Sequence, residues 1–104
     1  MRLRRDPFRD VVSRQLDLFA EDEAELIAEC HEKERAYDRA AREEAEEAYG
    51  DYVDAVEAAT EALADMRDRF ARTLDDEAAA EYEAAFNRAV RRRWPPFGLE
   101  IENR

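Results

Sequence analysis

Residues 45–70 read AEEAYGDYVDAVEAATEALADMRDRF, and apolar side chains recur along this stretch at alternating intervals of four and three residues. The positions that share the spacing are Ala45, Tyr49, Tyr52, Val56, Ala59, Leu63, Met66 and Phe70. Such a heptad-like repeat predicts a long helix whose apolar seam packs against another helix at a shallow angle, as in a coiled coil. We therefore expect these eight positions to form a core seam or an interface.

A weaker form of the same repeat precedes this stretch, beginning after Asp6 and Pro7, a pair that predicts a helix start near residue 7. Its apolar positions are Val12, Leu16, Phe19, Leu26, Cys30 and Tyr37, with interruptions at Glu23 and Lys33. Asp22 and Glu25 resemble a capping box, so a kink near residue 21 is one option.

The repeat slips in phase between Tyr37 and Tyr49, where the spacing becomes four, four, four. This predicts either a turn near residues 38–41, with Asp38 capping the second helix, or a stutter in one unbroken helix. We favour the turn, because an unbroken helix over residues 7–73 would be roughly 100 Å long, too long for this chain to cover.

The acidic residues at positions 75–77 predict the start of a third helix, and Pro95 and Pro96 predict its end, so we expect a helix over residues 76–93. The tail then alternates, with Phe97, Leu99 and Ile101 two residues apart, which is typical of an extended segment with one buried side. Such a tail would add about 23 Å to the third helix. We expect it, with Trp94, to pack along the groove between the first two helices.

The fold class predicted from these patterns is all-α: an antiparallel, coiled-coil-like helical hairpin with a shorter third helix and an extended C-terminal tail. We expect a single helical domain over residues 1–104, because 104 residues suit one small core. No apolar run approaches the roughly 18 residues of a membrane span, and the polar stretch DPFRDVVSRQ follows the basic start MRLRR where a signal peptide would be apolar. We expect no membrane association and a cytoplasmic location.

The net charge of -11 is unevenly distributed. Residues 1–14 and 88–94 are basic, with net charges of +3 and +4, whereas residues 15–87 carry -17. The hairpin would place the two basic clusters about 27 Å apart with an acidic body between them, so we expect no nucleic-acid binding. The acidic body would instead suit a basic protein partner, which it would bind as a mimic of nucleic acid.

Glu43, Glu44 and Glu47 follow the pattern E-E-x-x-E, which resembles the magnesium-binding motif of all-α nucleotide pyrophosphatases related to MazG. The resemblance implies a magnesium site completed by an acidic pair on another helix. The nearest pair, Asp65 and Asp68, lies on the same predicted helix, roughly 27 Å beyond Glu47. A second copy of the chain would have to complete the site.

The sequence favours structural roles for the two remaining candidate residues, His31 and Cys30. His31 lacks the glutamate three residues before it that di-iron helical bundles use, since position 28 is alanine. Cys30 falls on the apolar repeat, as a buried thiol does, and as the single cysteine it forms no intrachain disulfide. We therefore expect no cofactor and no catalytic residues.

The function predicted from the sequence is that of a non-enzymatic helical interaction or structural module that forms a homodimer. Alanine-rich seams on a long hairpin would leave apolar stripes that a second copy covers. The two alternatives are the MazG-like pyrophosphatase and the acidic decoy for a basic protein.

Overall fold

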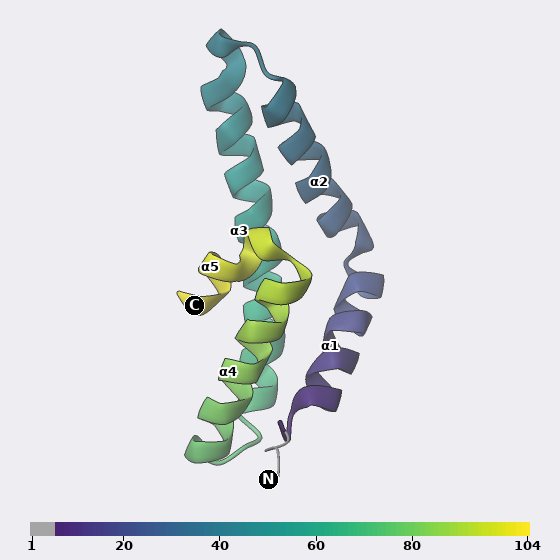
Figure 1. Cartoon of the computed structure of the whole chain (residues 1–104), viewed down its shortest axis with the longest axis vertical. Coiled ribbons are helices and arrows are strands. Elements are labelled where there is room, and N and C mark those ends of the chain that lie inside the picture. Colours follow the sequence, from purple (N-terminus) through teal and green to yellow (C-terminus); the bar gives the residue numbers. More distant parts are fainter. Residues whose placement is uncertain (1–5) are drawn as a thin grey trace, which may run out of the picture.

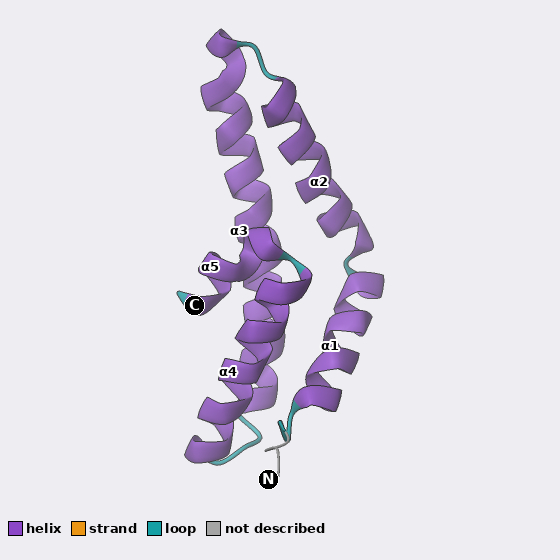
Figure 2. Cartoon of the chain, viewed as in Figure 1, coloured by secondary structure: helices purple, strands orange, loops and turns teal. Residues whose placement is uncertain are grey.

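The computed structural model describes residues 6–104, which form helices joined by short connections (Figure 2). The elements are α1 (Arg9–Asp22), α2 (Ala24–Arg39), the 3-10 turn η1 (Arg42–Glu44), α3 (Ala45–Ala71), α4 (Asp76–Arg93), the 3-10 turn η2 (Pro95–Phe97) and α5 (Gly98–Glu102). No strand occurs among these residues. The all-α class predicted from the sequence is confirmed.

Helices α2 and α3 lie side by side and run in opposite directions (Figure 1). Helix α1 leads into α2 on one side of the molecule, and α4 packs against both α1 and α3. Helix α5 crosses near the end of α4 and contacts α3 and α4. The chain is elongated, measuring 55 × 31 × 24 Å, because α2 and α3 extend past α4 with no third described helix beside them.

The connection between α2 and α3 is the turn that the phase slip predicted. Ala40 and Ala41 adopt extended backbone, with ψ of 137° and 158°, and α2 ends at Arg39. The expectation that Asp38 caps the next helix is wrong, because Asp38 lies inside α2 and the residue before α3, Glu44, makes no capping hydrogen bond.

A second break separates α1 from α2 at Glu23, one of the positions where the apolar repeat is interrupted. Its φ and ψ of -110° and 31° are not helical. No side chain caps the start of α2, so the capping box suggested by Asp22 and Glu25 does not form. The break lets α1 lie against α4 while α2 follows α3.

The bounds of α4 agree with the predicted helix over residues 76–93. Asp75 caps it, since its Oδ1 accepts a hydrogen bond from the backbone N–H of Ala78 at 2.8 Å. At the other end of the chain α1 begins at Arg9, two residues later than expected, and Asp6 Oδ1 accepts the backbone N–H of Phe8 at 2.9 Å.

The core lies where α1, α3, α4 and α5 meet. Its largest fully buried side chains are Val12, Leu16, Phe19, Leu63, Tyr82, Phe86, Val90 and Ile101. Tyr82 extends this core to α1, because its hydroxyl donates a hydrogen bond to Gln15 Oε1 at 2.8 Å and its ring lies edge-on to Phe8. Helix α1 is therefore held to α4 by both apolar and polar contacts.

The C-terminal segment is helical, and the expected extended tail is wrong. Phe97 and Ile101 are buried and stand four residues apart, on one side of the short helical segment, whereas Leu99 is 79% exposed. An extended strip would have buried all three side chains. Trp94 and Phe97 border a small cavity with Cys30 of α2 and Val56 of α3, but α5 then folds back on α3 and α4, so the tail does not continue along the groove toward the α2–α3 turn.

The segment also depends on a close approach at Gly98, which is buried. A Cβ atom at this position would lie 2.9 Å from Arg91 Cγ, so the start of α5 packs directly on α4. Gly50 differs, because a Cβ atom there would meet nothing within 4 Å. Within one chain, no helix crosses close to Gly50.

Candidate functional site

The eight seam residues have two different environments. Val56, Ala59 and Leu63 are buried in the core, and Met66 and Phe70 pack against it. Tyr49, nearer the turn, is 51% exposed. The seam therefore continues beyond the region that α4 and α5 cover, into residues 31–54, which we call the distal segment.

Two tyrosines form the main exposed apolar feature of the distal segment. The rings of Tyr37 on α2 and Tyr49 on α3 contact each other, with centroids 5.2 Å apart, although 38% and 51% of these residues are exposed. The hydroxyl of Tyr52 lies 3.4 Å from Glu34 Oε2, to which it donates, and burial together with this carboxylate raises the pKa of Tyr52. Sequence reasoning assigned all three tyrosines to a buried face, but only Tyr52 is half-buried.

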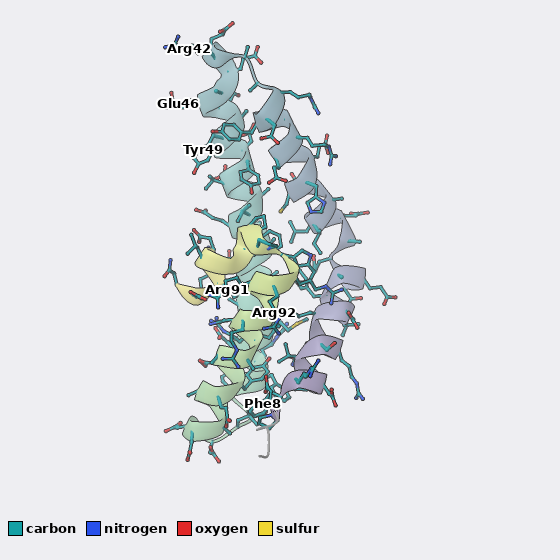
Figure 3. All side chains as sticks on the ribbon, viewed as in Figure 1. Phe8, Arg42, Glu46, Tyr49, Arg91 and Arg92 are labelled. Atoms are coloured by element: carbon teal, nitrogen blue, oxygen red, sulfur yellow. The ribbon has the colours of Figure 1, made fainter. Side chains whose placement is uncertain are left out.

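Charge is divided between the two helices of the distal segment. Residues 31–42 carry four basic and three acidic side chains, whereas residues 43–54 carry six acidic side chains and no basic one. Arg42 and Glu46 lie at the turn end, far from Arg91 and Arg92 (Figure 3). The distal part of α3 is thus strongly negative, whereas the facing part of α2, which ends at Arg39, has no net charge.

Glu43, Glu44 and Glu47, the residues with the MazG-like spacing, are all exposed in η1 and the first turn of α3. Asp68 pairs with Arg67 at the other end of the same helix. Within residues 6–104 no group of three histidine, cysteine, aspartate or glutamate side chains lies close enough together to hold a metal ion.

Cys30 is buried, and its thiol donates a hydrogen bond to the Ala55 carbonyl oxygen at 3.2 Å. Burial, reinforced by Glu29, raises the pKa of this thiol, so the nucleophilic thiolate is disfavoured. His31 is exposed and borders, with Cys30, a cavity of only about 20 Å³. These contacts show that the thiol of Cys30 packs inside the core.

The aromatic residues of the tail also pack. Trp94 is half-buried, with ring centroids 5.7 Å from Phe19 and 6.0 Å from Phe97, and the guanidinium of Arg93 lies 4.9 Å above its ring. Of the four tail residues expected to pack, Trp94, Phe97 and Ile101 do so and Leu99 does not.

Arg67 is the buried residue that sequence reasoning missed. It is 3% exposed; its Nη1 donates at 3.0 Å to both Asn87 Oδ1 and the Ile101 carbonyl, and its Nε donates to Asp68. It therefore links α3 to α4 and α5. Its position four residues after Leu63 and three before Phe70 places it on the apolar face of α3, and this spacing is the signal that could have identified it.

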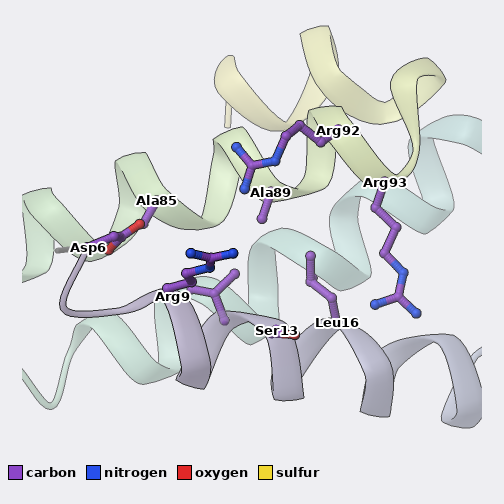
Figure 4. Close-up of a pocket in the computed structure, with 9 residues that line it drawn as sticks. Asp6, Arg9, Ser13, Leu16, Ala85, Ala89, Arg92 and Arg93 are labelled. Atoms are coloured by element: carbon purple, nitrogen blue, oxygen red, sulfur yellow. The ribbon is translucent and has the colours of Figure 1, made fainter. Parts of the chain in front are cut away.

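The two basic clusters of the chain contribute to one groove of about 270 Å³ between α1 and α4 (Figure 4). Arg9 and Ser13 border it from α1, and Arg92 and Arg93 border it from α4. The arrangement differs from the expected separation of about 27 Å, because α1 lies beside the C-terminal half of α4. Arg2, Arg4 and Arg5, which complete the N-terminal cluster, lie outside the described residues.

Comparison of the chain with protein-family models, curated proteins and solved structures returned no significant match. None of the helices in residues 6–104 combines the length and the apolar character needed to cross a membrane.

Proposed function

We propose that this protein is a non-enzymatic helical module whose distal segment associates with a second copy of the chain. The observation that carries the proposal is the division of the seam. Its repeat runs from Ala45 to Phe70 without a change of spacing, yet α4 and α5 cover only the part beyond Tyr52. An uninterrupted heptad-like repeat is the pattern of helices that pack along their whole length.

The α2–α3 pair of a second copy of the chain is the partner that best fits the uncovered part of the α3 seam. Outside the distal segment, α4 packs on both α3 and α1, so the seam of α3 is covered there. Two distal segments related by a twofold axis would form a four-helix, coiled-coil-like bundle, and would cover Tyr37 and Tyr49 of both copies.

Charge favours one pairing of helices in this dimer. Residues 43–54, the end of η1 and the distal part of α3, have a net charge of -6, whereas residues 31–39, the distal part of α2, have a net charge of zero. Packing α2 of one copy against α3 of the other separates the two acidic helices, whereas packing α3 against α3 would bring twelve carboxylates together. We therefore propose that each α2 contacts the partner's α3.

Sedimentation equilibrium over a wide range of protein concentration tests the proposal. We expect a monomer–dimer equilibrium that tightens as salt is added, because each distal segment has a net charge of -5 and salt screens the repulsion between copies. A basic partner, the alternative favoured by the same acidity, would instead bind more weakly as salt is added.

Substitution of an exposed apolar residue locates the interface. Tyr49→Glu should weaken the dimer by at least about tenfold, equivalent to roughly 1.4 kcal/mol, because it would bury a new charge. Leu18→Glu is the matched control, since Leu18 is 52% exposed on α1 and lies outside the distal segment. A wild-type protein that stays monomeric at every concentration, or a dimer equally weakened by both substitutions, would overturn the proposal.

A further inference from the structure

The groove between α1 and α4 is built around pairs of charged residues at its edges. Arg88 Nη2 lies 3.8 Å from Asp6 Oδ2, and Arg93 Nη1 donates to Asp17 Oδ1 at 2.6 Å. The first pair joins the segment before α1 to α4, and the second joins α1 to the end of α4. The groove lies between them, so its walls are tied together at both ends.

Between the ion pairs are two arginines without an acidic partner. Arg9 and Arg92 border the groove, and neither side chain forms an ion pair or a hydrogen bond with another residue of the described range 6–104. In Figure 4 the side chains of Arg9 from α1 and Arg92 from α4 both extend toward the part of the groove beside Ala89. Two like charges directed into one space repel, and a bound anion would relieve that repulsion.

The groove is bordered mainly by positive charges, although the protein as a whole is acidic. The chain as a whole has a net charge of -11, but the groove is bordered by three arginines and one carboxylate, that of Asp6. Asp6 already faces Arg88, and Asp17 faces Arg93. The charge left unmatched in the groove is therefore that of Arg9 and Arg92.

The size and the donors of the groove match a single phosphate group. Ser13 lies one helical turn after Arg9 on the same wall and adds a hydroxyl donor. A guanidinium donates two parallel hydrogen bonds to a phosphate, so two arginines from two helices can hold a dianion from both sides. A volume of about 270 Å³ admits the phosphate and a small organic group beside the apolar floor formed by Val12, Leu16 and Ala89.

We propose that the α1–α4 groove is a binding site for a small phosphate monoester, with Arg9 and Arg92 holding the phosphate and Ser13 contributing a hydrogen bond. The ligand is small because the groove is closed at its ends by the pairs that contain Asp6 and Asp17, and carboxylates repel a longer polyanion. The site is independent of the distal segment, so it goes beyond the proposed self-association.

Isothermal titration of the full chain with inorganic phosphate at constant ionic strength tests the site. We expect one phosphate per chain, with acetate and chloride binding at least about tenfold more weakly, since neither carries two charges. Binding should weaken as the pH falls below about 6, where the dianion of a phosphate ester becomes protonated.

Arg9→Gln and Arg92→Gln should each weaken phosphate binding by about tenfold or more. Arg72→Gln is the matched control, because Arg72 is an exposed arginine at the end of α3, remote from the groove. Without phosphate, the Arg9 and Arg92 variants should melt no lower than the wild type, since each removes one of two positive charges that repel each other. The self-association of both variants should be unchanged.

Three outcomes would overturn the site: phosphate binding no tighter than chloride, equal loss in all three variants, or tighter binding of a short single-stranded oligonucleotide than of inorganic phosphate. The last result would identify a surface for polyanions. None of these outcomes bears on the dimer, whose interface contains neither Arg9 nor Arg92.

Discussion

Arg67 is the residue on which the packing of the C-terminal half depends most. Its guanidinium is buried among α3, α4 and α5, and its hydrogen bonds satisfy Asn87 Oδ1 and the carbonyl of Ile101. A buried charge is tolerated only when such partners surround it. Its partners also explain why a short helix such as α5, which could not persist alone, stays docked.

Replacement of Arg67 by methionine should lower the free energy of unfolding by about 2–3 kcal/mol, because it leaves the buried Ile101 carbonyl and the partly buried Asn87 Oδ1 without this donor. Urea denaturation measures the change. Arg69→Met, at an exposed position on the same helix, should cost less than about 1 kcal/mol. Equal losses in the two variants would contradict the assigned role of Arg67.

Tyr82 gives the fold a dependence on alkaline pH. Burial raises the pKa of its hydroxyl to about 12, although the hydrogen bond to Gln15 acts in the opposite direction. A tyrosine in the unfolded chain titrates near about 10, so above that pH the unfolded state loses its proton first and binds fewer protons than the folded state. The stability contributed by the raised pKa is complete below pH 10 and is lost as the pH rises toward 12.

Tyr82→Phe should therefore show a shallower loss of stability than the wild type between about pH 10 and 12. At neutral pH the variant should be less stable by about 1 kcal/mol, because the hydrogen bond to Gln15 is lost. Urea unfolding at a series of pH values measures both effects. Parallel pH profiles for the two proteins would show that Tyr82 does not carry the dependence.

Individual residues differ in how far the sequence predicts them. The buried position of Leu63 and the partly buried position of Phe70 follow from periodicity alone. Arg67 shares that face but was not identified, because a charged residue on an apolar stripe is buried only when other elements supply its partners. Those partners come from residues 87 and 101, and no local pattern places them beside α3.

Among the elements, α4 was predicted with its correct bounds because its start and end signals are local. Asp75 caps the first turn, and the paired prolines after Trp94 prevent continuation of α4. The α2–α3 turn was likewise predicted from a break in periodicity, although the alternative of a stutter stayed open. The break between α1 and α2 at Glu23 was harder to predict from the sequence, since no capping side chain marks it.

The C-terminal segment could not be predicted because five residues are too few to distinguish two periods. Apolar residues at 97, 99 and 101 fit an extended strand, but 97 and 101 also fit one helical turn. The choice depends on tertiary contacts: the Arg67 bond to the Ile101 carbonyl and the ion pair between Arg91 and Glu102.

The helical form of this segment predicts unequal effects of two alanine substitutions. Ile101→Ala should lower stability by about 2–4 kcal/mol, because Ile101 is fully buried. Leu99→Ala should change it by less than about 0.5 kcal/mol, because Leu99 is exposed to solvent. Thermal or urea unfolding separates the two results, and equal losses would favour an extended tail instead.

The whole molecule is thick where α4 packs on α1 and α3 with α5 beside them, and thin where only α2 and α3 remain (Figure 1). The sequence implied an incomplete covering of a long hairpin but placed the tail over the gap. Since the tail folds back, more of the distal segment is open than the sequence suggested, and this enlarges the surface available to a second copy. The two basic clusters, expected to be separate, instead border one groove.

Amide hydrogen exchange at low and high protein concentration tests the central claim most directly, because it shows which helices a second copy covers. The account predicts that residues 31–54 become more protected as the concentration rises, whereas residues 76–93, already packed within one chain, change little. Protection that is independent of concentration, or that increases in residues 76–93 and not in residues 31–54, would contradict it.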